Sequence, residues 1–322
     1  MKAFVLACFL AATAAGPSVI RTRAQIETYK SALEKSREDD GLTLEQRMEM
    51  NPKANVWENS GKFEGDILLD DDMIQGLVSH YSTGRMAFIH PNTKWPGNTA
   101  VYEFGAGEFN IDQQRFILNV MNGLQERTCI RFRHRNSQDR NFVRITGQAN
   151  GCYARVGYGS HVGVHTLNLA RARPGEGCLN FVVIAHEWYH SLGFFHMQST
   201  YSRDNYHLFT GMGHNFDKYD NTVVGNLGLP YEYGSSMHYG SHGFTSNGRP
   251  TLTPRQHYNG VLGQTTHVTG TDIWRLARHY NCPGAWGRDI AQKAASTVVL
   301  AHEDGTLYDQ NVEPAEELKF PE

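Results

Sequence analysis

The stretch from His186 to His196 constrains the fold more than any other part of the chain, because its sequence, HEWYHSLGFFH, spaces three histidines and a glycine. If residues 181–192 are helical, His186 and His190 lie on one face, about 6 Å apart along the axis, and can reach one metal ion. Gly193 can take the left-handed conformation that ends a helix, so the chain can turn and bring His196 back as a third ligand. The pattern predicts a buried helix that carries a zinc site.

The number of ligands indicates a catalytic rather than a structural zinc. Three protein ligands leave a fourth position open for water, whose pKa falls to roughly 7 on the metal. Glu187 follows the first histidine and can take the proton of that water as a general base. A His-Glu-x-x-His match also arises by chance on amphipathic helices, but the third histidine and the glycine at their offsets favour the metal site.

The N-terminus has the pattern of a signal peptide. Lys2 precedes an apolar run over residues 3–12, and small residues up to Gly16 supply a cleavage site, which predicts a signal over residues 1–15. That run is too short for a membrane span, and no later stretch has the roughly 20 apolar residues that a span needs. We therefore expect a secreted protein. A net charge of -3 and a pI near 6.6 give no reason to expect a nucleic-acid partner.

Four cysteines remain once Cys8 leaves with the signal: Cys129, Cys152, Cys178 and Cys282. An even number in an oxidising compartment predicts two disulfides, for which three pairings are possible. The cysteines are scattered singly, with no Cys-x-x-Cys pair, which disfavours a zinc–thiolate site.

Residues 16–85 are polar and charged, with few aromatic residues before Trp57. Such a composition predicts a segment that cannot build its own core. The segment ends at Arg85, a basic site that a trypsin-like enzyme can cut. It is either a disordered linker or a propeptide, and a secreted hydrolase favours the propeptide. Within it, residues 63–67 read FEGDI, where a carboxylate lies next to a glycine that lets backbone approach a surface closely.

Residues 86–282 have the patterns of a globular domain. Asn110 can cap a helix whose apolar residues recur at helical spacing. Thr269 and Asp272 begin a last helix that ends at Cys282. We expect strands over residues 99–104, 129–132 and 142–145, and an edge strand beside the cleft over residues 165–170. An extended peptide substrate would pair with that edge.

The C-terminal tail, residues 283–322, has few aromatic residues and an acidic end. We expect it to be flexible, although residues 296–300 have the pattern of a strand that can pair.

Residues 236–239, Ser-Met-His-Tyr, form a turn bounded by glycines. With the third histidine and this turn both in place, the sequence resembles the astacin family of metzincin zinc endopeptidases over residues 63–282. The resemblance implies an α+β fold, in which an upper subdomain has a twisted sheet and two helices and an irregular lower subdomain ends in a C-terminal helix. The zinc cleft would lie between them. The resemblance also implies that Cys129 pairs with Cys282 and Cys152 with Cys178.

The resemblance assigns roles to several residues. One Zn²⁺ per chain would be bound by His186, His190 and His196, with Glu187 as the general base. Tyr239 would ligate the metal at rest and stabilise the oxyanion when substrate binds, because a phenol can be both ligand and donor. Met237 would lie beneath the zinc. The alternative for Tyr239 and for Met237 is simple core packing.

The FEGDI motif is similar to the prosegment motif of the family, in which an aspartate occupies the open position of the zinc. Here Asp66 would ligate the metal in the proenzyme only and exclude the catalytic water. Met197 departs from the family, which usually has a glutamate there that interacts with the buried N-terminus of the mature chain. Arg255 lies where meprins place a basic residue facing the side chain after the cleaved bond. That position predicts a preference for acidic substrates, and the alternative is a solvated surface charge.

The main competing hypothesis is a secreted zinc-binding recognition module without catalysis. Retention of Glu187 favours the enzyme. Another metzincin branch is disfavoured because the prosegment has no lone cysteine to block the zinc. The expected partners are protein or peptide substrates and an activating protease, and the pattern leaves the oligomeric state and the physiological substrate open.

Overall fold

The computed structural model describes residues 21–83, 93–209, 216, 218–219, 227–287 and 297–310. The predicted signal peptide and the predicted cut at Arg85 lie outside these residues. Within these ranges, no helix combines the length and the apolar character needed to cross a membrane.

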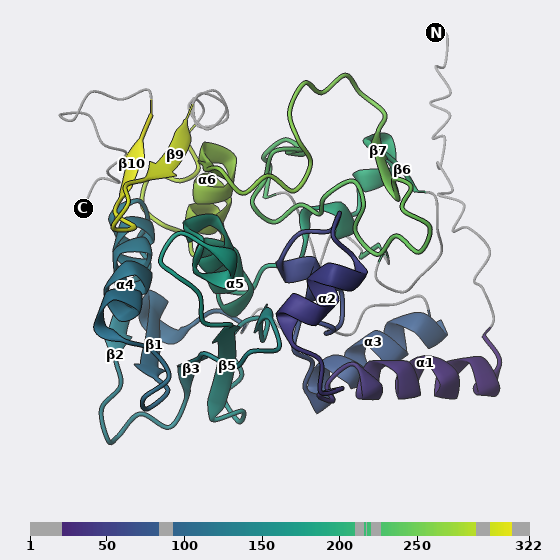
Figure 1. Cartoon of the computed structure of the whole chain (residues 1–322), viewed down its shortest axis with the longest axis horizontal. Helices are drawn as coiled ribbons and strands as arrows, with labels where there is room; N and C mark the ends of the chain where they lie inside the picture. The colour runs from purple at the N-terminus through teal and green to yellow at the C-terminus, as the bar shows by residue number, and fades with distance from the viewer. Residues whose placement is uncertain are drawn as a thin grey trace, which may run out of the picture.

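A five-stranded sheet forms one side of the molecule (Figure 1). Four strands are parallel neighbours and the fifth runs antiparallel at the edge, in the order β2-β1-β3-β5-β4. The strands are β1 (Thr99–Phe104), β2 (Arg131–His134), β3 (Phe142–Thr146), β4 (Cys152–Ala154) and β5 (Val164–Leu169). The expected strands are present, with β2 beginning two residues later than predicted.

The prediction that residues 165–170 form the edge strand is wrong. Strand β5 lies between β3 and β4, and the edge is the three-residue β4. The sequence did not indicate β4, because three residues after the turn at Gly151 are too few to show an alternating pattern.

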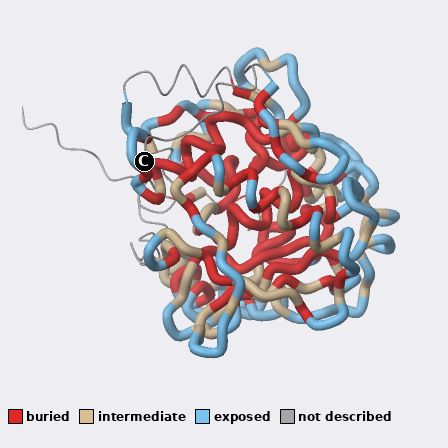
Figure 2. Tube along the Cα trace, turned by 90° about the vertical axis from the view of Figure 1, so that its left-hand side faces the viewer, coloured by how far each residue is buried: buried red, intermediate tan, exposed pale blue. Residues whose placement is uncertain are grey.

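Helices α4 (Ile111–Glu126) and α5 (Phe181–Ser191) pack against each other and against the sheet. Asn110 begins α4 with a capping box to Gln113, as its sequence predicts. Helix α5 is capped by Asn180, and all its residues from Val182 to Ser191 are buried. Figure 2 shows that buried chain fills the centre of the molecule and exposed chain surrounds it. The central helix therefore brings its polar side chains into the core, where a polar group without a partner is costly.

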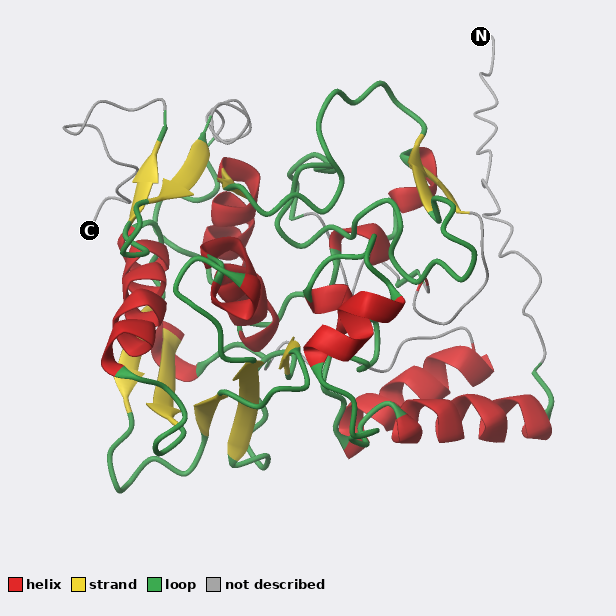
Figure 3. Cartoon of the chain, viewed as in Figure 1, coloured by secondary structure: helices red, strands yellow, loops and turns green. Residues whose placement is uncertain are grey.

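The chain after α5 has little regular structure (Figure 3). Strands β6 (His207–Phe209) and β7 (Leu252–Pro254) form a two-stranded ladder, and α6 (Gly270–His279) is the last helix among the described residues. This division confirms the expected α+β fold. In the described part of the chain, short 3₁₀ helices include η1 (Trp57–Asn59), η2 (Pro96–Asn98), η3 (Gly177–Leu179), η4 (Met197–Ser199) and η5 (Arg203–Asn205). Disulfides join Cys129 to Cys282 and Cys152 to Cys178, as the family resemblance implies.

The N-terminal segment is folded rather than a disordered linker, but it forms its core together with the main domain. It forms α1 (Arg23–Lys35), α2 (Leu44–Met50) and α3 (Asp71–Thr83), and α1 and α3 lie side by side with Tyr29 stacked on Tyr81 (Figure 1). Most of its buried apolar residues form a second cluster, which three residues of the main domain complete: Val156, Phe195 and Tyr219. Composition alone could not reveal this cluster because part of it belongs to another region.

The N-terminal segment also bonds both sides of the main domain. Leu44 N–H donates to the Ala149 carbonyl (2.8 Å), beside the sheet, and Lys53 Nζ donates to the Gly248 carbonyl (3.0 Å), in the irregular region. The segment therefore contacts both the region of the sheet and the irregular region.

Part of the C-terminal tail, residues 297–310, forms a small sheet with the domain, whereas we expected the tail as a whole to be flexible. Strand β9 (Val298–Ala301) confirms the expected strand and pairs with β8 (Val268–Thr269) and with β10 (Leu307–Asp309). Arg127, just after α4, forms a buried ion pair with Asp309 (2.9 Å). The two residues are 182 positions apart in the sequence, so this buried ion pair attaches the hairpin to the domain.

Candidate metal centre and catalytic site

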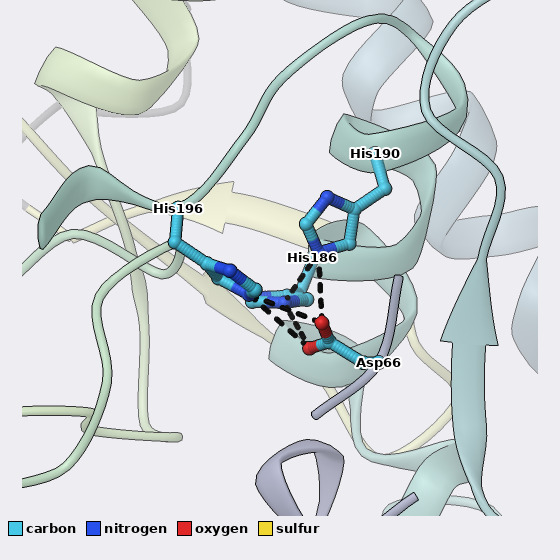
Figure 4. A group of neighbouring side chains, drawn as sticks. All are labelled: Asp66, His186, His190 and His196. Carbon is cyan, nitrogen blue, oxygen red and sulfur yellow. Dashed lines mark hydrogen bonds and ion pairs between the residues drawn. The ribbon is translucent and has the colours of Figure 1, made fainter. Parts of the chain in front are cut away.

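Three buried histidines, two of them on helix α5, point toward one another and toward Asp66 (Figure 4). His186 and His190 lie one turn apart on the helix, and Gly193 has a φ of +107°, the left-handed value expected where the chain turns back toward His196. The Nδ1–H of His186 donates to the Ser236 carbonyl, and that of His190 to the Phe194 carbonyl, both at 2.7 Å. These bonds leave the Nε2 atoms facing one another, 3.1 Å apart.

Asp66 completes the group from the N-terminal segment. Its carboxylate oxygens lie 3.0 Å from His186 Nε2, 3.4 Å from His190 Nε2 and 3.2 Å from His196 Nε2. The potential ligand atoms of the four residues all lie within 4.8 Å of one another. Each of the three imidazole rings is hydrogen-bonded through Nδ1 and presents Nε2 to the centre. Three Nε2 atoms and one carboxylate are a donor set that suits tetrahedral Zn²⁺. The residues therefore fit the metal that the sequence predicts.

Glu187 is fully buried next to the first histidine. Within the described part of the chain, neither of its carboxylate oxygens has a hydrogen-bond partner. Burial, and then the negative charge of Asp66, raise the pKa of Glu187 well above its ordinary value. A carboxylate with a raised pKa is the kind of group that accepts a proton near neutral pH.

The turn with Met237 and Tyr239 is also buried. Met197 N–H donates to the Met237 carbonyl (2.8 Å), so the two segments are joined beside the histidines. Tyr239 OH donates to the Glu64 carbonyl (2.6 Å), so the tyrosine is bonded to the N-terminal segment.

Several residues of the site were not predicted from the sequence. Asp272 of α6 accepts from Ser236 N–H (2.7 Å) and so supports the carbonyl that orients His186. Trp57 stacks on His186 with ring centroids 4.8 Å apart. Neither position carries a recognisable signal, because each acts through a partner distant in sequence.

Glu58 and Glu64 were missed as well, and both belong to the N-terminal segment. Glu58 is buried and accepts from Gly240 N–H (2.5 Å), and burial raises the pKa of its carboxyl to about 7. Glu64 accepts from His196 Nδ1 (2.9 Å). Glu64 lies inside the FEGDI motif, so its closeness to Asp66 was the one available signal.

The N-terminal segment also occupies the edge of the sheet. Ile67 forms a parallel bridge with Ala154 of β4. Ala154 N–H donates to the Asp66 carbonyl, and Leu68 N–H donates to the Ala154 carbonyl, both at 2.9 Å. The edge that an extended peptide could use is therefore already paired.

Arg255 follows strand β7, and its backbone N–H donates to the Tyr206 carbonyl. Its guanidinium is exposed, and Nη1 donates to the Asp204 carbonyl (2.6 Å). Met197, by contrast, is buried at 2% exposure in the main core.

Comparison with known proteins identifies the family of this site. The family model "Astacin (Peptidase family M12A)" matches residues 87–281. The chain belongs to the astacin family. As a member of this family it is a zinc metalloendopeptidase, and the three histidines beside Asp66 form a group able to bind its metal.

Individual astacin-family relatives differ in how much of them the chain covers. It is 29% identical to the zinc metalloproteinase nas-4 of Caenorhabditis elegans, over 88% of this chain and 90% of that protein. It is 32% identical to protein SpAN of Strongylocentrotus purpuratus and to meprin A subunit alpha of Rattus norvegicus, but spans only 48% and 27% of their lengths. Among solved structures, a hatching enzyme zinc-protease of Oryzias latipes is 31% identical with a TM-score of 0.51, over 59% of this chain and 93% of that one.

Proposed function

We propose that this protein is a secreted zinc endopeptidase made as a latent proenzyme, with residues 16–85 as its prosegment and residues 86–282 as its catalytic domain. The observation that carries the proposal is the Asp66 carboxylate, which reaches the Nε2 atoms of all three histidines. A carboxylate in that place excludes the water that hydrolysis requires.

In this proposal His186, His190 and His196 hold the zinc in both forms, and Asp66 adds a fourth ligand in the proform. When bound, zinc is a Lewis acid that makes water nucleophilic near neutral pH. Glu187 accepts the proton of that water and returns it to the leaving amine. Its lack of a hydrogen-bond partner among the described residues suits a group whose partner is the reacting water.

The prosegment fills two further places that catalysis needs. Tyr239, proposed to stabilise the oxyanion, is bonded to the Glu64 carbonyl, and the edge of β4 is paired with Ile67. Release of the segment frees the phenol and the edge together. We propose that an extended protein or peptide substrate then pairs with β4, which gives affinity through backbone bonds without demanding sequence.

Secretion and activation complete the proposal. A signal over residues 1–15 would direct export, and the two disulfides are consistent with an oxidising compartment. An activating protease would cut near Arg85.

The competing proposal, a catalytically silent zinc-binding module, is disfavoured because Glu187 lies buried beside the metal site with no structural partner among the described residues. The Glu187→Ala variant distinguishes the enzyme from the silent module. Wild-type and Glu187→Ala proforms are treated with trypsin and assayed for zinc content and for cleavage of internal peptide bonds.

We expect treated wild type to cleave protein substrates, and treated Glu187→Ala to hold one zinc per chain without cleaving them. A treated wild-type enzyme that holds zinc but cleaves nothing would support the silent module instead. Loss of zinc from Glu187→Ala would contradict the separation of base and ligands.

A further inference from the structure

Glu64 contacts the side of His196 that faces away from the proposed zinc. Its Oε2 atom lies 2.9 Å from His196 Nδ1, while Asp66 Oδ1 lies 3.2 Å from Nε2 of the same ring. Two carboxylates of one short motif therefore bracket one imidazole. The Nδ1 atoms of the other two histidines are bonded to backbone carbonyls instead.

The Glu64 carboxylate is itself held in place. Tyr219 OH donates to Oε1 (2.6 Å), and Ser199 Oγ donates to Oε2 (3.4 Å). The backbone of Glu64 has a φ of +47°, and that of Gly65 a φ of +88°. These two successive left-handed residues turn the chain so that the side chains on both sides of Gly65 reach His196. Non-glycine residues rarely take this conformation, which indicates that the contact is built rather than incidental.

We propose that Glu64 is a positioning residue for zinc in the proform, an inference that rests on the proposed function. Its carboxylate accepts the Nδ1–H of His196, which fixes the tautomer and ring orientation that present Nε2 to the metal. A carboxylate partner also makes the imidazole a stronger ligand, and loss of such partners typically costs about 10- to 100-fold in metal affinity.

This assignment has a consequence for activation. Glu64 belongs to the segment that processing removes, so the mature enzyme holds His196 without this carboxylate. Met197, the next residue after His196, offers no carboxylate in its place. Zinc is therefore bound more tightly before activation than after it, by an effect separate from the loss of Asp66 as a ligand.

The test compares zinc retention in uncut proforms. Wild type, Glu64→Gln, Asp66→Ala and Glu27→Gln are equilibrated with increasing chelator, and the zinc that remains bound is measured. Glu27→Gln is the matched control, because it makes the same change at an exposed position of α1. We expect Glu64→Gln to raise the apparent zinc dissociation constant about tenfold or more, and Glu27→Gln to leave it unchanged. A Glu64→Gln value within about twofold of wild type would overturn the assignment.

A second measurement separates positioning from a general effect on folding. After processing, the Glu64 residue is gone, so enzyme made from Glu64→Gln should match wild type in zinc affinity and in peptide cleavage. A persistent difference between the processed enzymes would overturn the proposal. If Glu64→Gln is not secreted, the test uses Tyr219→Phe, because this change removes only the hydroxyl that donates to Glu64 Oε1. Zinc retention should then weaken about threefold or more, and unchanged retention would overturn the proposal.

The outcomes distinguish this inference from the proposed function. If processed wild type cleaves no peptide, the enzyme proposal fails, whereas chelator resistance still reports on Glu64. If wild type becomes active but Glu64→Gln retains zinc normally, the positioning role alone fails.

Discussion

Gly65 gives the sharpest test of how the prosegment is held, because it forms the turn between Glu64 and Asp66. Its φ of +88° is a value that alanine adopts at a cost of about 1–2 kcal/mol. A Cβ at this position would also lie 2.9 Å from the Glu58 Cα, so the turn or Glu58 must move. Overpacking of this kind costs about 1–3 kcal/mol more. Gly65→Ala should therefore weaken docking of the prosegment by about 2–5 kcal/mol, which is roughly 25-fold or more.

Gly41 is the matched control for this substitution. It has a φ of +78° in the same segment, but an added Cβ would meet nothing within 4 Å. Gly41→Ala thus carries the backbone cost without the collision. Both changes are made in a chain with Arg85→Gln, so that the segment stays attached, and peptide hydrolysis is measured. We expect the uncut Gly65→Ala chain to hydrolyse the peptide at least about five times faster than the uncut Gly41→Ala chain. A folded, zinc-loaded Gly65→Ala chain as silent as its control would refute this reasoning.

Three further predictions concern other parts of the molecule. Because burial raises the pKa of Glu58 to about 7 from 4.5, the docked segment keeps a proton that the released segment loses, so docking should weaken as the pH rises through this range. Glu58→Gln should flatten that dependence in limited proteolysis of the proform, and an unchanged pH profile would argue against it. Asp309→Ala should destabilise the processed enzyme by about 3–5 kcal/mol in urea, because Arg127 is left buried and unpaired, whereas Asp112→Ala, whose partner Arg115 is exposed, should change little. Equal effects of the two would contradict a structural role for the tail. Arg255 should favour Asp or Glu after the cleaved bond by only a few fold, because its guanidinium is exposed and screened. A peptide library cleaved at equal rates by wild type and Arg255→Ala would remove that residue from specificity.

The zinc helix could be predicted because its information is local. The spacing of His186 and His190, and the glycine before His196, determine the geometry within a few turns of chain. The edge strand could not be predicted, because β4 has only three residues, from Cys152 to Ala154, and so lacks a periodic signal. The family resemblance supplied the disulfide pairs, which spacing alone left open.

The remaining differences arise from contacts between distant segments. The core of the N-terminal segment is completed by Val156 and Phe195, so its own composition underestimates its order. The tail is fixed by the pair of Arg127 with Asp309, which are 182 residues apart. The role of Glu64 depends on a left-handed backbone that no pattern of residue types announces.

The most direct test of latency is the activity of an uncut Asp66→Ala proform. In a chain with Arg85→Gln, wild type and Asp66→Ala are matched for zinc content and assayed on the same peptide before and after removal of the prosegment by another protease. Asp66→Ala should cleave the peptide before removal, though more slowly than the processed enzyme, because Tyr239 and the edge of β4 remain bonded to the segment. Wild type should be silent until removal. An uncut Asp66→Ala proform that holds zinc and is as silent as wild type would contradict the account, because latency would then not depend on the carboxylate at the metal.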